Sequence, residues 1–463
     1  MFSKEIYLQR RKTLMEKVGN GLILLLGNGE VGRNYKANEY RFRQDSNFLY
    51  YTGLENPHVA AILDADSHVT HFFGHDFSMD DVIWTGYETS LKALAAKTGI
   101  HNTYPFDHIA STLQQAIAQG RKIHFLPPYR HENSLYLHTW LGFPIAYLTE
   151  KSSPTLIQAI VNQRAVKSDE ELREMEAAVN TSRAIHIALM QRAKAGMKEA
   201  ELVGIAEGIA RATGNGLAYF PIVTVQGQTL HNHYDQNTLV AGQMMLADVG
   251  AESYQGYAAD ITRTFPVNQQ FTTQQKEIYQ IVLKANEQII AHIRPGVTYR
   301  AMHLMAARII AEGLKALGLM QGDTDAAVEE GAHALFMPHG LGHLIGLDVH
   351  DMEDLGEDYV GYTSDIVRSK QFGTAYLRFA KILQMGHTLT VEPGIYFIPA
   401  LIDKWQKERK FTSFINYDKI SDYRNFTGIR IEDNIVVTSD GCRVLGHPIP
   451  KSIEAVEALR GVI

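Results

Sequence analysis

Five short fragments in the second half of this chain most constrain what it can fold into. Each places an acidic residue or a histidine within or beside a patterned run, as in TVEPGIYF and GIRIEDN. Successive side chains of a strand point to opposite faces, so a strand can bury one face and present a carboxylate on the other. The five residues, in chain order, are Asp248, Asp260, His343, Glu392 and Glu432. They predict a site at which four carboxylates and one imidazole converge.

The spacing of polar residues along the strands supports this convergence. Asp248 and Asp260 flank a glycine-bearing connection, 249–256, that predicts a hairpin turn. Three sets of residues each share one strand face: Asp260 with Thr262 and Thr264, Arg430 with Glu432, and Glu392 with Thr388 and Thr390. The residues between them point the other way and are largely apolar. Carboxylates gathered in this manner need positive charge, from side chains or metal, to offset their repulsion.

The length of 463 residues predicts two domains, 1–162 and 163–463. In the first domain, strand-like apolar runs alternate with amphipathic stretches near 90–98 and 109–119, which is a mixed α/β pattern. The strand-like runs are 21–27, 59–64, 69–74 and 122–127.

The second domain has the pattern of an α+β domain with a largely antiparallel sheet. Ser168 and Glu171 form a capping-box pattern that predicts the start of its first, long helix. Helices are expected at 168–194, 198–212, 274–291 and 299–317, and strands at 219–226, 243–249, 256–265, 387–397 and 428–438. The candidate ligands therefore lie mainly on strands, with helices packed outside.

The charge balance argues against several classes of partner. A net charge of −7 and a pI near 6.3 give no support for nucleic acid or an anionic membrane as a partner. The N-terminal MFSKEIYLQRRK is charged where a signal peptide is apolar, and the apolar run at 22–26 is too short to span a bilayer. The single cysteine, Cys442, excludes an intrachain disulfide. A cytoplasmic protein is expected.

Four carboxylates and an imidazole form a hard, oxygen-rich donor set. Such a set suits Mn²⁺, or Co²⁺ or Zn²⁺ by availability, rather than a thiolate-bound metal. Two ions roughly 3.5 Å apart could share a water as hydroxide, which could then attack a carbonyl. Each residue alone has a plainer explanation, because a strand aspartate is commonly a turn residue, and His339 and His350 could be packing residues. Only their joint occurrence favours metal ligation.

The same fragments resemble the signatures of one enzyme family. FMPHGLGHLIGLDVHD, TLTVEPGIYFI and GIRIEDNIVVT are similar to the motifs of the creatinase/aminopeptidase, or pita-bread, metallopeptidases. They are most similar to the proline-specific branch, aminopeptidase P and prolidase. YRFRQDSNFLYYTGLENP, at 40–57, resembles the N-terminal domain of that branch. The resemblance implies an α+β pita-bread catalytic domain that follows an N-terminal α/β creatinase-like domain.

The resemblance also implies a role for each ligand of a two-metal site. Asp248 would be a terminal ligand to one metal. Asp260 and Glu432 would bridge both metals. His343 and Glu392 would complete the second, and Glu392 would also be the acid/base partner of the hydroxide.

Further residues match family positions that surround the metals, where substrate is bound, the tetrahedral intermediate is stabilised and the carboxylate charge is balanced. These residues are His233, which lines the site, His339 and His350, which bind substrate and stabilise the intermediate, and Tyr396 and Arg430, which lie behind the ligands. His231, beside His233, is expected to be a loop residue.

The implied activity is hydrolysis of the Xaa-Pro bond at the N-terminus of short peptides, by a homodimer or homotetramer. Aminopeptidase P is the first choice because of the N-terminal signature, and prolidase, restricted to dipeptides, is the alternative. Prolidase is favoured by the segment 398–427, which is longer than in typical bacterial aminopeptidase P chains. Its cations are Lys404, Lys407, Arg409, Lys410 and Arg424. They could bind a dipeptide carboxylate, but a solvated face is the preferred interpretation for most of them.

Three other interpretations are weaker. The complete ligand set argues against a non-catalytic binding protein of this fold and against a metal-free, creatinase-like amidinohydrolase. The long N-terminal domain disfavours methionine aminopeptidase. One departure from the family is the spacing of Asp248 and Asp260, which are twelve positions apart, one more than in most relatives. The extra residue is expected in the turn around 252–255, because a shift of either strand would turn one ligand away.

Overall fold

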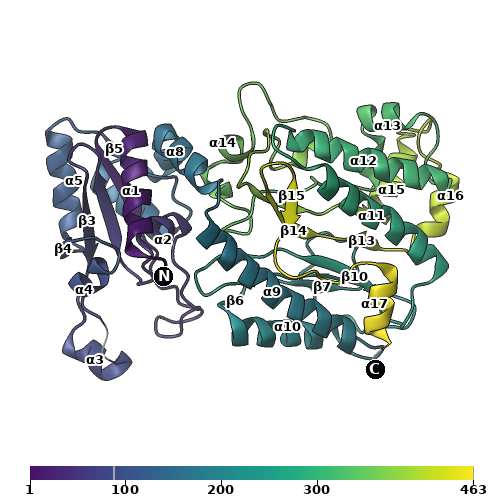
Figure 1. Ribbon diagram of the computed structural model, residues 1–463, viewed down its shortest axis with the longest axis horizontal. Helices are drawn as coiled ribbons and strands as arrows, with labels where there is room; N and C mark the ends of the chain where they lie inside the picture. Colours follow the sequence, from purple (N-terminus) through teal and green to yellow (C-terminus); the bar gives the residue numbers. More distant parts are fainter. Residues whose placement is uncertain (87–88, 462–463) are drawn as a thin grey trace. The chain divides into compact units, whose positions relative to one another are not determined.

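The computed structural model describes residues 1–86 and 89–461, and the chain divides into two compact units (Figure 1). Unit 1 comprises Met1–Arg164 together with Met352–Tyr359, and unit 2 comprises Ala165–Asp351 together with Val360–Ile463. The chain thus first passes between units two residues after the expected end of the first domain. The short return of residues 352–359 to unit 1 has no counterpart in the sequence-based division.

Unit 1 is built on a five-stranded mixed sheet with the order β4-β3-β2-β1-β5. Its strands are β1 (Leu22–Leu26), β2 (Ala60–Asp64), β3 (Val69–Gly74), β4 (Asn102–Pro105) and β5 (Ile123–His124). The β1–β2 and β2–β3 pairs are antiparallel, whereas β4 and β5 are added in parallel at the two edges. Four of these strands fall within the apolar runs expected from the sequence.

The helices of unit 1 account for most of the remaining chain. They are α1 (Lys4–Val18), α2 (Ser46–Thr52), α3 (Met79–Thr85), α4 (Leu91–Ala96), α5 (His108–Ala118), α6 (His131–Leu141), η1 (Ile145–Tyr147), α7 (Leu148–Lys151) and α8 (Pro154–Arg164), with η3 (Glu353–Leu355) in the returning segment. α5 presents Ile109 and Leu113 to the core, with Ala116 one turn further on, so its buried face keeps helical spacing.

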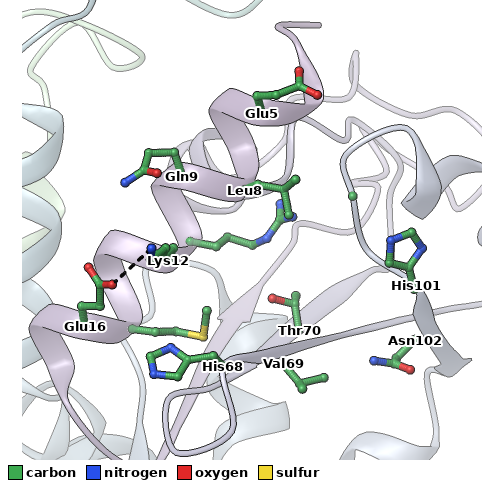
Figure 2. A pocket seen from close by; sticks show the side chains of 13 residues that line it. Glu5, Leu8, Gln9, Lys12, Glu16, His68, Val69, Thr70, His101 and Asn102 are labelled. Atoms are coloured by element: carbon green, nitrogen blue, oxygen red, sulfur yellow. Dashed lines mark ion pairs between the residues drawn. The ribbon is translucent and has the colours of Figure 1, made fainter.

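A cavity of about 650 Å³ lies beside α1 and the start of β3 (Figure 2). Lys12 and Glu16 of α1 form an ion pair of 3.8 Å at its wall, and His68 and His101 lie across from them. Arg11 also lines the cavity, and burial lowers its pKa to about 10. None of the candidate metal ligands lies in this unit.

Unit 2 places antiparallel strands between pairs of long helices (Figure 1). Its helices are α9 (Asp169–Arg192), α10 (Glu199–Thr213), α11 (Thr273–His292), α12 (Tyr299–Ala316), α13 (Thr324–Glu330), η2 (Ala332–Leu335), η4 (Thr374–Tyr376), α15 (Pro399–Lys407), α16 (Tyr417–Ile420), η5 (Ser421–Tyr423) and α17 (Ile453–Arg460); α14 (Glu357–Gly361) spans the end of the returning segment. α10 packs against β6 and β7, and α11 packs against β11, β12 and β13.

Every strand pair described in unit 2 is antiparallel, as expected. The strands are β6 (Gly216–Leu217), β7 (Ile222–Thr224), β8 (Met244–Asp248), β9 (Ala251–Glu252), β10 (Thr262–Pro266), β11 (Thr388–Val391), β12 (Gly394–Tyr396), β13 (Gly428–Arg430), β14 (Asp433–Val437) and β15 (Cys442–Val444). They form two three-stranded sheets, β10-β8-β7 and β11-β14-β15, and two two-stranded sheets, β12-β13 and β6-β9.

The first helix of unit 2 begins where its cap predicts. The Ser168 hydroxyl accepts a hydrogen bond from the Glu171 N–H, and the Glu171 carboxylate accepts one from the Ser168 N–H. This reciprocal cap satisfies two N–H groups that the helix itself cannot use. The acidic residues of the first turn also match the positive end of the helix dipole.

The expected strands 387–397 and 428–438 are each broken in two, and a candidate ligand lies at each break. Pro393 has no N–H to contribute, so the pairing between β11 and β14 stops at Val391. It resumes between β12 and β13 at Gly394. Glu392 and Glu432 therefore stand opposite each other in a gap in the sheet. The sequence predicts the ligands within continuous strands, but Asp248 is the last residue of β8, Asp260, Glu392 and Glu432 lie within two residues of a strand end, and His343 lies in a loop.

Candidate metal centre

The first two carboxylates come from one hairpin. Asp248 ends β8 and pairs with Thr262, so Asp248 and Thr262 share a face with Asp260. The pairing continues beyond Asp248 to a hydrogen bond of 2.8 Å from the Ser253 N–H to the Tyr257 carbonyl. The reversal is therefore at 253–257, later than the expected turn at 249–256. The register has no slip, and both aspartates reach the same site.

Glycine is required at one position of this hairpin. Gly250 lies opposite Asp260, and a Cβ there would lie 1.7 Å from the Ala259 carbonyl oxygen. Any other residue would push the two chains apart beside Asp260. The glycine noted in the connection thus serves a close backbone approach between the two ligand-bearing strands.

Glu392 and Glu432 are held at their gap by backbone bonds to other segments. The Glu392 N–H donates to the Leu341 carbonyl over 2.9 Å, and the Glu432 N–H donates to the Thr262 carbonyl over 3.1 Å. The Thr262 hydroxyl donates to Oε2 of Glu432 over 2.7 Å. Oε1 of Glu432 is buried and has no hydrogen-bond partner. An orphaned carboxylate oxygen inside a protein costs free energy unless a cation or donor meets it.

His343 presents one ring nitrogen to the carboxylates. Its Nδ1 lies 2.9 Å from the Leu344 carbonyl, to which it donates. This leaves Nε2 facing Oδ2 of Asp260 at 3.3 Å and Oε1 of Glu392 at 3.7 Å. A histidine ligand whose other N–H is fixed by a carbonyl has the usual arrangement for metal binding.

The charges of the cluster are out of balance. Burial, followed by the neighbouring carboxylates, raises the pKa of Glu432 well above its ordinary value. Burial raises the pKa of Glu392 to about 7 and that of Asp248 to about 6. Burial opposes the ionised form of Asp260 as well, but hydrogen bonding to His343 holds its pKa below the ordinary value. Cations are needed if all four are to ionise together.

The donor atoms are close enough to hold such cations. Three groups of residues each bring one ligand atom apiece to within 4.8 Å of one another: Asp248, Asp260 and Glu432; His343, Glu392 and Glu432; and Asp260, His343 and His350. Shared membership of Asp260 and Glu432 links the groups into one cluster. Together with the orphaned oxygen of Glu432, this geometry fits divalent metal ions.

Arg430 lies behind the cluster with each arm of its guanidinium engaged. Nη2 donates to Oδ2 of Asp248 over 2.5 Å, Nε donates to the Thr262 hydroxyl over 3.0 Å, and Nη1 donates to the Tyr396 hydroxyl over 2.8 Å. The Tyr396 hydroxyl also lies 3.0 Å from Nε2 of His339. Arg430 thus connects a carboxylate of the cluster to His339 through one tyrosine.

Tyr219 belongs to the site although no sequence pattern indicated it. Its hydroxyl lies 2.5 Å from Oδ1 of Asp248 and 2.7 Å from Oδ1 of Asp260. Burial and these carboxylates raise the pKa of Tyr219 well above its ordinary value. The tyrosine lies between β6 and β7, in the first part of the expected strand 219–226, which does not form, so strand parity could not place it.

The remaining expected residues lie at different depths. The ring of His350 lies 4.1 Å from that of His343, next to the cluster. His233 is exposed and packs edge-on against Phe220 at 4.7 Å. His231 is also exposed, yet partial desolvation and then the charges of Arg430 and another arginine lower its pKa. The structure therefore brings His350 to the cluster and leaves the other two at its open side.

The cations of segment 398–427 are engaged or exposed within that segment. Arg424 pairs with Asp403, and Lys410 lies over the Trp405 ring at 4.2 Å. Lys404, Lys407 and Arg409 are exposed. These contacts agree with the preferred interpretation of most of them as a solvated face.

Buried carboxylates that converge with a histidine at strand ends define a metal-dependent hydrolase. The protein-family comparison agrees with this class. The model described as "Metallopeptidase family M24" matches residues 173–439, and the one described as "Aminopeptidase P, N-terminal domain" matches residues 7–124. The chain belongs to metallopeptidase family M24, and the family expected from the sequence is confirmed.

Individual relatives cover nearly the whole chain. An Xaa-Pro dipeptidase of Homo sapiens is 33% identical over 95% of this chain and 88% of its own length. A probable Xaa-Pro aminopeptidase of Botryotinia fuckeliana is 33% identical over 90% of this chain and 87% of its own. The solved aminopeptidase PepP of Pseudomonas aeruginosa matches with a TM-score of 0.82 at 28% identity, over 99% of this chain and 98% of that one. The fold class and enzyme class expected above are confirmed.

Among the described residues, no helix combines the length and apolar character needed to cross a membrane.

Proposed function

We propose that this protein is an exopeptidase that uses two divalent cations to hydrolyse the Xaa-Pro bond at the N-terminus of short peptides. The observation that carries the proposal is the linked donor cluster, in which Asp260 and Glu432 are shared between groups of ligands. The names of the relatives support the choice of substrate, because both dipeptidases and aminopeptidases among them act on Xaa-Pro bonds.

The proposed ligands are the five residues expected from the sequence. Asp248 would hold one cation, Asp260 and Glu432 would bridge two, and His343 and Glu392 would hold the second. When bound, the cations supply Lewis acidity and a water whose pKa is lowered toward neutrality.

The side chains around the ligands would handle protons and orientation. Glu392 would accept a proton from the attacking water and deliver it to the proline nitrogen as that nitrogen leaves. His350 would donate to the carbonyl oxygen as its charge develops. His339, whose Nδ1 donates to the Gly340 carbonyl and whose Nε2 accepts from the Tyr396 hydroxyl over 3.0 Å, would be held in place to bind the substrate. His350 and His233 would contact the substrate on the open side, and Arg430 would keep Asp248 ionised.

Selectivity for proline has a physical basis. A peptide bond to proline is a tertiary amide without an N–H, so proteases that hold an extended, hydrogen-bonded substrate bind it poorly. Cleavage then depends on a proton donor for the ring nitrogen and on capture of the free α-amine. The proposed site would meet the first requirement through Glu392 and the second by positioning the first residue of the peptide through its free α-amine.

A second candidate, a dipeptidase, is favoured by one residue outside the expected set. The positive charge of Arg378 acts on His231, as does that of Arg430, so Arg378 lies close to the open side of the site. Its neighbour Leu377 approaches Gly340, the residue after His339, within 2.7 Å of a Cβ built there. An arginine in this place fits the carboxylate of an Xaa-Pro dipeptide better than the cations of segment 398–427 do.

The test compares release of the N-terminal residue from Ala-Pro and Ala-Pro-Ala by the metal-loaded protein. Cleavage of the tripeptide supports an aminopeptidase, cleavage of the dipeptide alone supports a dipeptidase, and cleavage of neither refutes the proposal. If Arg378 binds the carboxylate, Arg378→Gln raises KM for Ala-Pro more than about tenfold. Arg424→Gln, an exposed arginine of segment 398–427, is the matched control and should leave KM unchanged.

We further propose Mn²⁺ as the native metal, because the donor set is rich in carboxylates. A solved aminopeptidase P of Escherichia coli is a zinc-substituted form in complex with product, so that relative also accepts zinc. Elemental analysis of protein purified without chelator decides the point. A cytoplasmic location and a homodimer or homotetramer stay predictions.

A further inference from the structure

A buried ion pair lies directly behind the loop that carries His350. Nζ of Lys167 lies 2.9 Å from Oδ2 of Asp351, and each side chain is 1% exposed. Asp351 follows His350 in the chain, and Lys167 immediately precedes the cap of α9. The pair therefore joins the start of a long helix to the end of the loop on which a proposed active-site histidine lies.

The loop between the two histidines is closed by a single carbonyl. The Leu344 carbonyl accepts from Nδ1 of His343 and from the Asp351 N–H, each over 2.9 Å. One oxygen thus sets the orientation of the His343 ring and also fixes the residue that follows His350. As a result the two imidazoles lie 4.1 Å apart although seven positions separate them.

The ion pair is packed so tightly that it sets the shape of this loop. A Cβ at Gly346 would lie 2.5 Å from Oδ2 of Asp351 and 2.8 Å from Cε of Lys167. The Gly346 carbonyl accepts a bond of 2.8 Å from the Ala258 N–H, in the hairpin that carries Asp260. A displacement of the ion pair would therefore be transmitted to both sides of the metal cluster.

Lys167 is itself held to the sheet. Its N–H donates to the Gly386 carbonyl over 2.9 Å, and Val166 forms a bridge with His387, next to the start of β11. The backbone of Lys167 is thereby fixed to the sheet, so its ammonium group can hold Asp351 in one position. Since a buried ion pair seldom contributes net stability relative to apolar residues, its presence at this position calls for another explanation.

We propose that Lys167 and Asp351 are a positioning pair that holds His350 against the metal cluster for turnover. This inference rests on the proposed function, in which His350 contacts the substrate. Lys167 supplies no atom to the candidate groups of metal ligands, and the positioning role requires that most of its effect on the rate pass through His350 and not through the hairpin that carries Asp260.

The test is a double-mutant cycle of Lys167→Met and His350→Ala in the full-length, metal-loaded protein. Lys167→Met should lower kcat for the better of the two peptides about 10- to 100-fold, with KM and bound metal nearly unchanged. In the His350→Ala background the same change should alter kcat less than about twofold. Independent, multiplicative losses would overturn the inference.

A core truncation controls for loss of stability. Leu314→Ala removes a fully buried side chain of α12 and should lower the melting temperature while kcat is retained. If Lys167→Met does not fold, the doubly neutral variant Lys167→Met/Asp351→Leu replaces it, because both charges of the pair are then removed together. This variant should fold and still show the loss of kcat, and full activity would overturn the inference.

A structural readout separates this inference from the proposed function. In a crystal structure of Lys167→Met, or of the doubly neutral variant, the His343–His350 ring distance should exceed 4.1 Å. An unchanged distance overturns the positioning role, whatever the protein hydrolyses. Failure of the wild-type protein to cleave either peptide would instead refute the proposed function.

Discussion

Glu432 and Asp433 are adjacent, equally buried carboxylates in opposite electrostatic surroundings. Oδ1 of Asp433 accepts from Arg263 over 2.6 Å, and Oδ2 accepts from Lys451 over 2.7 Å. These cations outweigh the cost of burial and lower the pKa of Asp433 to about 2. Glu432 faces the carboxylates of Asp260, Glu392 and Asp248. Burial and then these neighbours raise its pKa well above the ordinary value.

The difference shows that two adjacent residues can have separate roles: Asp433 stabilises the fold through ion pairs, and Glu432 belongs to the candidate metal cluster. Alternate side chains point to opposite faces, so one residue separates a satisfied ion-pair cluster from an unsatisfied acidic one. Arg263 completes the first cluster by also donating to the Glu432 and Ile449 carbonyls. The second cluster has a deficit of positive charge, which is what a metal site offers before its cations bind.

The largest expected effect comes from removing Glu432, the carboxylate of the adjacent pair that faces the metal cluster. Glu432→Ala should lose bound metal and lower kcat/KM more than about 1,000-fold, because Asp260 would be the one proposed bridging carboxylate left. The metal-free variant should be at least as stable as metal-free wild type, since a carboxyl group whose burial among other acids is unfavourable is gone. Elemental analysis, peptide hydrolysis and thermal unfolding after chelation measure these three quantities. Retention of metal at wild-type levels would contradict the bridging role.

The neighbouring substitution should give the reverse result. Asp433→Ala leaves Arg263 and Lys451 buried without their carboxylate, and should lower the free energy of unfolding by about 3–5 kcal/mol. The folded fraction should still bind metal at the wild-type ratio. Urea unfolding and elemental analysis of the same preparation check both statements. If Asp433→Ala lost metal while remaining stable, the two sides of the strand would not be functionally separate.

Local sequence patterns were sufficient to predict much of this arrangement. The capping box at Ser168 marked the start of α9, and period-two alternation placed Thr262 and Asp260 on one face. These features depend on neighbours within a few positions. The broken strands at Glu392 and Glu432 were not foreseen, although Pro393 is a local signal for the end of pairing. The carbonyls that accept the two N–H groups, those of Leu341 and Thr262, are distant in the chain and have no local pattern.

Long-range contacts explain the other omissions. Tyr219 reaches Asp248 and Asp260 across 29 and 41 positions, and Lys167 reaches Asp351 across 184. A tyrosine in a short irregular segment and a lysine before a helix cap have no distinctive local pattern. Only the folded arrangement shows that their partners are a ligand pair and the neighbour of His350.

The pH dependence of stability should differ between the two clusters in chelated protein. Glu392 has a pKa raised from 4.5 to about 7, so the folded state holds a proton that the unfolded state releases at lower pH. The free energy of unfolding should therefore fall as pH rises from about 4.5 to 7, by roughly 3 kcal/mol from this group. Asp433, with a pKa lowered from 3.8 to about 2, loses its contribution only as pH falls through that lower range.

Bound metal should remove the pH dependence of stability that Glu392 contributes and leave the contribution of Asp433 unchanged. Cations bind the ionised form of Glu392, so the loaded protein holds no extra proton between pH 4.5 and 7 at saturating metal. Urea unfolding at a series of pH values, with chelator or with Mn²⁺, measures the difference. Buried histidines such as His186 and His303, whose pKa burial lowers to about 3, make stability rise with pH over the same range. The contribution of Glu392 is therefore measured as the difference between metal-free wild type and metal-free Glu392→Gln. Equal pH dependence in the two proteins would contradict the proposed charge deficit.

The smallest expected effect concerns Tyr219, a neutral hydrogen-bond donor to the carboxylates of the metal cluster, and the affinity of that cluster for metal. The Tyr219 hydroxyl has one proton for two carboxylates, Asp248 and Asp260, so it can relieve only one of them at a time. Tyr219→Phe removes this donor without adding charge or opening a cavity, and should weaken metal binding about tenfold. Competition with a metal-sensitive dye gives the affinity, and KM for the peptide should hardly change.

Tyr279→Phe is the matched control on the ion-pair side of Asp433. It removes a hydroxyl that donates to the Lys451 carbonyl and should leave metal affinity unchanged. Equal affinities for wild type and Tyr219→Phe would mean that the cations alone balance the two aspartates.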